Sequence, residues 1–209
     1  SYDLLGDVNM AALTTQFVVY YHGGFSGRAQ PADLMLEDAG VPWRRGSKQE
    51  CFDQTGCVFA MPAVGKGARI VGQPTAACAF LGSEIGYAPA AGFEFDALKI
   101  ACDVADIWSE GYAKRKSRDS ALALRWLTER FVRFVQVIEA TRNAAAQRAG
   151  VADPWPYLLG AAPCYADFLW LNAVLVLEFM YGPKRTAKVL AAAGAPGVVG
   201  ATAAMRARP

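Results

Sequence analysis

Tyr21 stands at a point of the sequence where a phenol could stabilise a bound anion. The residues before it form a short run rich in β-branched and aromatic side chains, and Gly23 and Gly24 follow closely. A new pattern that suits a helix begins near Gly27. A strand, a glycine turn and a helix N-terminus in this order bring Tyr21 beside unpaired backbone N–H groups. Such a site binds anions and can stabilise a thiolate.

Two predicted elements must position this phenol. The run Phe17–Tyr21 predicts a buried strand. The following segment predicts a helix that ends at Gly40. One side of that helix is apolar, and the residues that form it are Ala29, Ala32, Leu34, Met35 and Leu36.

The composition indicates a globular protein that can bury a core. The chain has 209 residues, of which 54% are hydrophobic and 19% are charged. A net charge of +2 gives no electrostatic case for binding nucleic acid or an anionic membrane. The longest apolar segment, Phe168–Tyr181, is too short to span a bilayer and predicts a buried helix.

The cysteines favour a reducing compartment. Five are present at irregular spacings, which argues against a disulfide framework. No CxxC pair occurs and His22 is the only histidine, so we expect no metal site. We expect a cytoplasmic or organellar protein that is not secreted, with residues 1–16 as an N-terminal extension that could remain from a targeted precursor.

The first third of the chain resembles the tyrosine-type glutathione transferases. In that family a tyrosine precedes a Gly-Arg pair, and the helix that follows ends in an Ala-Gly step and an aromatic residue. The matching residues here are Tyr21, Gly27-Arg28, Ala39-Gly40 and Trp43. The resemblance implies that Tyr21 donates a hydrogen bond to the sulfur of glutathione. Ser26 is the rival activator, because serine-type transferases exist, although its spacing to Arg28 does not fit that type.

The segment around Met61-Pro62 extends the resemblance. Two short strands, about Ala60–Val64 and Ala68–Val71, flank a Gly-Lys-Gly turn and predict a hairpin. Met61-Pro62 resembles the cis-proline step of thioredoxin-like folds, where the residue before proline offers its backbone to glutathione. A helix is expected from Thr75 to about Ile85.

Pro74 departs from the family pattern. The family has Ser or Thr after the glutamine that matches Gln73, and its hydroxyl and N–H hold the γ-glutamyl carboxylate. Proline suits the first helical turn but supplies neither group. Thr75 could compensate.

The rest of the chain predicts an all-helical part. The composition of residues 88–94 indicates a linker, and the charged run KRKSRDS, which begins at Lys114, suits a solvated turn. Cys164-Tyr-Ala-Asp167 resembles the family's Thr/Ser-x-x-Asp cap of its core helix, which makes Asp167 structural. The expected helices are Phe95–Tyr112, Ala121 to about Ala149, Cys164–Tyr181, Pro183–Ala193 and Val198–Arg206.

The resemblance implies an α/β plus all-α fold. A thioredoxin-like βαβ-ββα domain (residues 17–87) would be followed by a helical-bundle domain (residues 95–209), with glutathione in a cleft between them and a homodimer as the usual assembly. The implied glutathione-binding residues are Trp43, Lys48, Met61, Pro62, Gln73 and Thr75. An electrophile pocket could be lined by Phe25, Trp108 and Tyr112, although aromatic residues at helical spacing are more often core. Lys48 could equally lie in a solvated loop, and Arg28 is more often an ion-pair partner than a ligand.

Two functions follow from these observations. The first is a glutathione transferase that acts on small hydrophobic electrophiles, with glutathione as co-substrate. The second is a lapsed transferase fold that serves as a scaffold or accessory subunit of a larger, possibly organellar, protein assembly. Pro74, Cys164 and the N-terminal extension motivate the second function.

Overall fold

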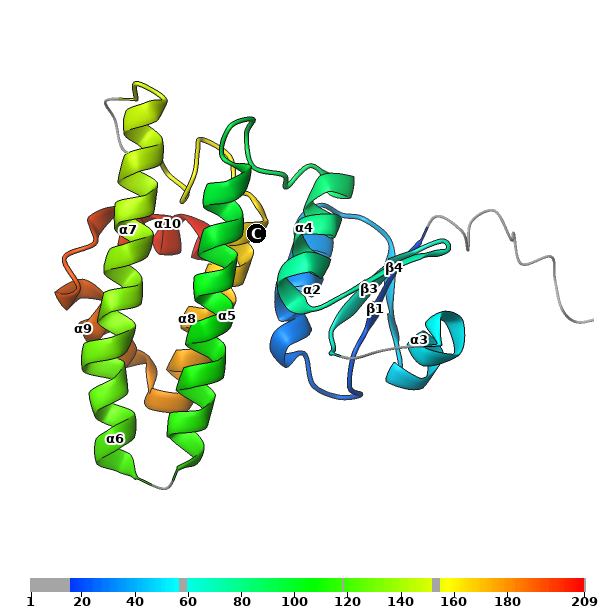
Figure 1. Ribbon diagram of the computed structural model, residues 1–209, viewed down its shortest axis with the longest axis horizontal. Helices are drawn as coiled ribbons and strands as arrows, with labels where there is room; N and C mark the ends of the chain where they lie inside the picture. Colours follow the sequence, from blue (N-terminus) through cyan, green and yellow to red (C-terminus); the bar gives the residue numbers. More distant parts are fainter. Residues whose placement is uncertain (1–15, 57–59, 118, 152–154, 209) are drawn as a thin grey trace, which may run out of the picture.

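The structure, a computed structural model, describes residues 16–56, 60–117, 119–151 and 155–208. A small sheet with its helices lies beside a set of longer helices (Figure 1). The strands are β1 (Phe17–Tyr20), β2 (Trp43–Gly46), β3 (Ala63–Lys66) and β4 (Arg69–Gly72), in the spatial order β2-β1-β3-β4. β1 is parallel to β2, while β3 is antiparallel to both β1 and β4. This is the expected βαβ-ββα arrangement.

The alternation of side chains along β1 separates the two adjacent tyrosines. Phe17, Val19 and Tyr21 face the main hydrophobic core. Tyr20 faces the other side of the sheet, where it packs with Cys51 and Ala63. A strand has a period of two residues, so neighbouring side chains must lie on opposite faces. Of the two tyrosines, Tyr21 therefore faces the core that is shared with the helical part, and Tyr20 does not.

Helices cover both faces of the sheet. The short helix η1 (Gly27–Ala29) leads into α2 (Gln30–Asp38), and α4 (Pro74–Ile85) packs beside α2, so that both lie between the sheet and the helical part (Figure 1). α3 (Lys48–Thr55) covers the opposite face. Residues 43–55 form β2 and α3, and the Ser47 hydroxyl caps α3 by accepting a hydrogen bond from the Glu50 N–H (3.0 Å).

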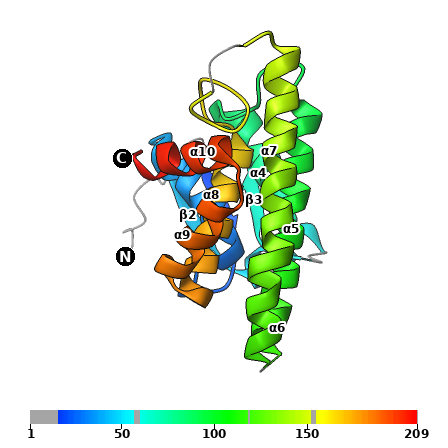
Figure 2. The ribbon, with the colours of Figure 1, turned by 90° about the vertical axis from the view of Figure 1, so that its left-hand side faces the viewer.

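The helical part has α8 at its centre (Figure 2). Its elements are α5 (Glu94–Lys116), α6 (Ser120–Arg125), the π-helical turn η2 (Trp126–Arg130), α7 (Phe131–Arg148), α8 (Tyr165–Tyr181), α9 (Pro183–Ala192) and α10 (Pro196–Arg206). The long helix expected from Ala121 to Ala149 is thus interrupted by η2.

α5 is longer than predicted, and mainly small and aliphatic residues form its buried face. It continues to Lys116, so residues 114–116 are helical rather than part of a turn. The side chains that pack inward are Ala97, Ile100, Ala101, Val104 and Ile107, with Gly111, while Leu98 and Tyr112 are exposed. A Cβ at Gly111 would lie 2.8 Å from the Trp126 ring, so this glycine allows the indole to pack directly against the helix backbone.

The N-terminus of α8 has the expected capping box. Asp167 is fully buried, and its two carboxylate oxygens accept hydrogen bonds from the N–H groups of Leu158 (2.8 Å) and Cys164 (2.9 Å). Cys164 completes the box in place of a hydroxyl residue. Burial raises the pKa of Asp167 to about 6, although its hydrogen bonds act in the opposite direction.

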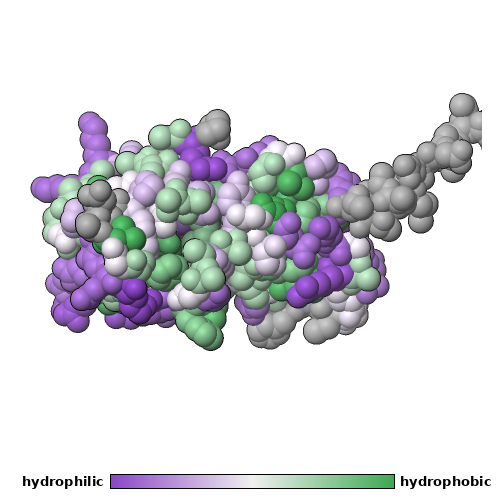
Figure 3. All heavy atoms as spheres, turned by 90° about the horizontal axis from the view of Figure 1, so that it is seen from above, coloured by the Kyte–Doolittle hydropathy of each residue, from purple (hydrophilic) through white to green (hydrophobic). Residues whose placement is uncertain are grey.

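One continuous core joins the sheet part to the helical part. Buried residues of β1, α2, α4, α5 and α8 form a single hydrophobic cluster, and α2 and α4 pack against α8. Seen from above, apolar and weakly polar residues cover much of the seam, and the most hydrophilic residues lie mainly toward the outer ends (Figure 3). Within the described ranges, no helix is both long and apolar enough to cross a bilayer.

Candidate functional site

The phenol of Tyr21 lies at the turn between β1 and η1. The ring is 8% exposed, and its oxygen accepts a hydrogen bond from the backbone N–H of Arg28 (3.3 Å). That N–H belongs to the first turn of the helical segment, where such groups have no partner within a helix. Gly27 makes this approach possible, because it has a φ of +42° and a Cβ there would lie 2.9 Å from the phenol oxygen.

The core helix α8 supports this turn. The amide nitrogen of Asn172 donates hydrogen bonds to the side-chain oxygen of Gln30 (2.7 Å) and to the carbonyl of Gly27 (3.4 Å). Asn172 has no solvent exposure. A polar side chain in an apolar helix therefore links the centre of the helical part to the backbone beside Tyr21.

A hollow of about 420 Å³ opens beside the Tyr21 phenol. It contains the catalytic tyrosine expected from the sequence, two of the expected glutathione-binding residues and all three expected electrophile-pocket residues. Aromatic and cationic side chains dominate its wall, and none of the described lining residues carries a carboxylate. The lining residues are Tyr21, His22, Phe25, Arg28, Lys48, Met61, Trp108 and Tyr112.

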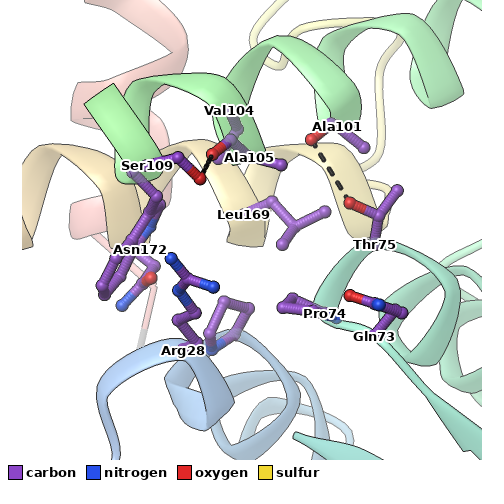
Figure 4. A pocket seen from close by; sticks show the side chains of 12 residues that line it. Arg28, Gln73, Pro74, Thr75, Ala101, Val104, Ala105, Ser109, Leu169 and Asn172 are labelled. Atoms are coloured by element: carbon purple, nitrogen blue, oxygen red, sulfur yellow. Dashed lines mark hydrogen bonds between the residues drawn. The ribbon is translucent and has the colours of Figure 1, made fainter. Parts of the chain in front are cut away.

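A smaller, more enclosed hollow of about 150 Å³ adjoins the first one at the N-terminus of α4 (Figure 4). Gln73 and Thr75 line it, together with Pro74. Gln73 has a φ of 70°, which is unusual for a residue other than glycine. The Thr75 hydroxyl donates a hydrogen bond to the carbonyl of Ala101 (3.5 Å), so it is already engaged with α5.

Two polar groups at the smaller hollow are unpaired within the described part of the chain. The side-chain oxygen of Asn172 is buried and has no hydrogen-bond partner there. The Arg28 guanidinium extends toward α5 (Figure 4), and no carboxylate pairs with it among the described residues. Its guanidinium carbon lies 5.8 Å from the centre of the Trp108 ring. Arg28 and Trp108 line both hollows and so form the partition between them.

Two of the expected glutathione-binding side chains do not line either hollow. The indole N–H of Trp43 donates a hydrogen bond to Glu37 (2.7 Å), and Arg45 lies over the ring, so Trp43 faces α2. Pro62 is buried, and the peptide bond before it is cis, as expected, which leaves Met61 as the residue at the hollow. We therefore leave the Trp43 side chain out of the candidate site.

The sequence reading missed three residues that the structure brings to the site. Arg28 was expected to have an ion-pair partner, and the only signal for another role was its Gly-Arg step. His22 was visible as the single histidine next to Tyr21. Asn172 was visible as a polar residue in the most apolar helix of the chain.

The described cysteines give no sign of an activated thiol. Cys51, Cys78 and Cys164 are buried, and Cys102 is exposed. Burial raises the pKa of Cys78 to about 12 and also raises the pKa of Cys164. These two side chains therefore remain protonated thiols at neutral pH.

Comparison with known proteins connects this geometry to one fold. The chain is similar to a Pi-class glutathione S-transferase of Onchocerca volvulus (16% identity, TM-score 0.69, covering 93% of this chain and 89% of the other). It is also similar to a glutathione S-transferase of Caenorhabditis elegans (18%, TM-score 0.60) and to prostaglandin synthase D of Nilaparvata lugens (18%, TM-score 0.57), each comparison covering 93% of this chain and 98% of the other. No protein-family model and no curated protein matches the sequence. The chain has the glutathione transferase fold, in which a thioredoxin-like part is followed by a helical part.

Proposed function

We propose that this protein is a glutathione transferase that conjugates the glutathione thiolate to small hydrophobic electrophiles. The observation that carries the proposal is the position of Tyr21. Its phenol lies at the wall of an open hollow and accepts a hydrogen bond from an N–H of a helical first turn. Aromatic side chains stand on the same wall to receive an apolar second substrate.

Thiol activation is the chemical task at this site. A free thiol has a pKa of about 8.5, and lowering it by about two units corresponds to roughly 2.7 kcal/mol. The Tyr21 hydroxyl would donate to the sulfur while its oxygen accepts from the Arg28 N–H. The thiolate then attacks the electrophilic carbon, a C–S bond forms, the leaving group departs with the electrons of the bond that held it to that carbon, and the thiol proton passes to solvent.

The other lining residues fit a tripeptide that carries two carboxylates. Lys48 stands in the larger hollow and is suited to the glycyl carboxylate. Arg28 lines both hollows, has no carboxylate partner in the described part of the chain, and is suited to the γ-glutamyl carboxylate, beside Gln73 and Thr75. Met61 would offer its backbone to the cysteinyl residue.

Pro74 weakens the γ-glutamyl end of this site. It begins α4 without an N–H or a hydroxyl, and the Thr75 hydroxyl, which could have compensated, already binds the Ala101 carbonyl. A lost hydrogen bond to a charged carboxylate costs about 1.5–3 kcal/mol. The guanidinium of Arg28 offsets part of this loss, so we expect measurable but weak glutathione binding.

Calorimetric titration with glutathione tests the proposal, together with conjugation of a general aryl halide. Binding of glutathione and saturable conjugation above the uncatalysed rate support it. The proposal fails if the purified protein shows no heat of binding and no conjugation.

A second candidate function is that of an accessory or scaffold subunit of a larger assembly. Pro74 favours it, as do two almost fully exposed phenylalanines on the helical part, Phe95 (84%) and Phe179 (91%). Aromatic residues are enriched at protein–protein interfaces. Native mass analysis of the protein purified from its source distinguishes the two functions, since a free homodimer alone argues for the enzyme.

The transferase proposal has three further parts. We propose two domains, residues 17–87 and 95–209, joined by a linker at 88–94. We also propose a homodimer and a reducing compartment, cytoplasmic or organellar, in which a role in detoxification would fit. Limited proteolysis between residues 88 and 94 would test the domain boundary.

A further inference from the structure

Lys116, in the basic run at the end of α5, extends the line of the helix that carries the aromatic wall of the larger hollow. Trp108, Tyr112 and Lys116 follow one another at intervals of four residues, so they lie along one face of the helix. The Lys116 ammonium lies 4.8 Å from the centre of the Tyr112 ring. Because α5 continues past its expected end, this cation contacts the ring of Tyr112, one of the wall residues of the hollow, instead of lying in a distant turn.

The acidic residues of α5 are turned away from this face. Asp103 pairs with Lys99 (2.6 Å), and Glu110 pairs with Arg130 (2.8 Å) on the side that faces α7 and η2. Asp106 precedes Trp108 by two residues, which corresponds to about 200° around the helix. The aromatic face of α5 therefore carries positive charge that no acidic residue of that helix neutralises at the hollow.

The lining of the hollow has the same charge bias. Arg28 and Lys48 are cationic, and among the residues that the structure describes no carboxylate belongs to the wall. If Lys48 and Arg28 take the two carboxylates of glutathione, Lys116 remains for the second substrate. An apolar, aromatic wall with a cation next to one of its rings suits a flat apolar body that carries one negative charge.

We propose that the electrophile end of the hollow, walled by Trp108 and Tyr112, selects electrophiles that carry a carboxylate or another anionic group, and that Lys116 is a specificity-determining residue. This inference rests on the proposed transferase function. With a chloronitrobenzoate, the glutathione sulfur attacks the ring carbon that bears chlorine. The C–S bond forms, chloride leaves with the electrons of the C–Cl bond, and the thiol proton passes to solvent.

Two aryl chlorides, one anionic and one neutral, test the inference. The kcat/KM for 4-chloro-3,5-dinitrobenzoate is compared with that for the neutral 1-chloro-2,4-dinitrobenzene, each divided by its uncatalysed rate constant with glutathione. We expect the ratio to favour the anion at low ionic strength and to fall as salt is added. Lys116→Gln should lower kcat/KM for the anion by about two- to fivefold, which is the range for a single exposed charge, and leave the neutral substrate unchanged.

Lys99→Gln is the matched control, because Lys99 lies on the same helix, nine residues before Trp108 and about half a turn around from it. It should leave both substrates unchanged. Equal preference for the two chlorides, or an unchanged ratio in Lys116→Gln, overturns the inference while the transferase proposal stands.

Failure of both chlorides to react would instead count against the transferase proposal. The charge preference is then measured without catalysis, by calorimetric titration of 3,5-dinitrobenzoate and 1,3-dinitrobenzene. Tighter binding of the benzoate that Lys116→Gln weakens supports the inference, and equal affinities overturn it.

Discussion

The backbone N–H of Arg28 donates a hydrogen bond to the phenol oxygen of Tyr21 across 3.3 Å. This contact fixes the direction of the phenol and leaves its hydroxyl proton free to be donated. The donor N–H also lies at the start of a helical segment, where the peptide dipoles favour negative charge. A thiolate beside Tyr21 would therefore be stabilised by the phenol directly and by the helix terminus indirectly.

Tyr21→Phe should remove the hydrogen bond to the sulfur and keep the packing of the ring. A hydrogen bond to a charged group contributes about 1.5–3 kcal/mol, so we expect kcat/KM to fall by about 10- to 150-fold. The pKa of the bound glutathione thiol should rise. The measurements are the pH–rate profile and the ultraviolet absorbance of the bound thiolate.

Tyr20→Phe is the control for this substitution. The Tyr20 hydroxyl donates to the side-chain oxygen of Gln54 (3.1 Å) on the other face of the sheet. Its loss should reduce the free energy of unfolding by about 0.5–1.5 kcal/mol and leave kcat/KM unchanged. Equal losses of activity in the two variants would contradict the assignment of Tyr21.

Gly27→Ala should displace the phenol without removing it. The new Cβ would lie 2.4 Å from the Phe25 ring and 2.9 Å from the Tyr21 oxygen, and φ at this position is +42°. We expect kcat to fall about tenfold or more, since a shift of about 1 Å at a reacting group can cost as much as a hundredfold. Gly24→Ala is the control: its φ is also positive (+71°), but a Cβ there meets nothing within 4 Å. It should lower stability, as any strained alanine does, while leaving kcat near the wild-type value.

Pro74→Ser should tighten glutathione binding. The substitution restores an N–H and a hydroxyl to the first turn of α4, next to the smaller hollow. One added hydrogen bond to a carboxylate corresponds to a decrease in Kd of at least about tenfold, measured by calorimetry. Pro183→Ser is the control, since Pro183 occupies the same position in α9 and lines neither hollow. If the two serine variants bind glutathione with equal affinity, the carboxylate does not lie at the N-terminus of α4.

The local elements of this chain could be predicted from the sequence because their signals are local. The β-branched and aromatic run of β1, the apolar side of α2 and the Cys164–Asp167 cap each depend on neighbouring residues, and all three occur in the structure. The ends of β3 and β4 lie one to three residues later in the sequence than expected. The reason is that Gly67 (φ +59°), and not the whole Gly-Lys-Gly run, makes the turn.

The relationships between distant elements could not be predicted in the same way. Arg28 resembles any surface arginine in the sequence, and only the packing of α5 against the sheet part brings Trp108 to it. Aromatic residues at helical spacing, such as Trp108 and Tyr112 on α5, are more often core. Instead, the aromatic face lines a hollow, and small residues such as Ala97 and Gly111 make the close contacts.

Asp167 should make part of the protein's stability depend on pH. Its pKa in the folded protein is about 6, above the usual 3.8, because burial penalises the charged form. The folded state therefore binds this proton more tightly than the unfolded state does. The contribution of this tighter proton binding to the free energy of unfolding is fully present below about pH 4 and is lost as the pH rises through 6.

Asp167→Asn tests this relationship by removing the ionisation. The variant also loses one of two acceptors for the N–H groups of Leu158 and Cys164, so we expect a destabilisation of about 1–3 kcal/mol. Because only the wild type titrates at this position, the difference in the free energy of unfolding between the two proteins should be larger at pH 4 than at pH 7. Urea unfolding between pH 4 and pH 7 measures this difference. Asp119→Asn, at the exposed cap of α6, is the control: it should lower the free energy of unfolding only slightly, because asparagine caps a helix about as well as aspartate. A difference between wild type and Asp167→Asn that stays constant from pH 4 to pH 7 would mean that this buried carboxyl group does not titrate there.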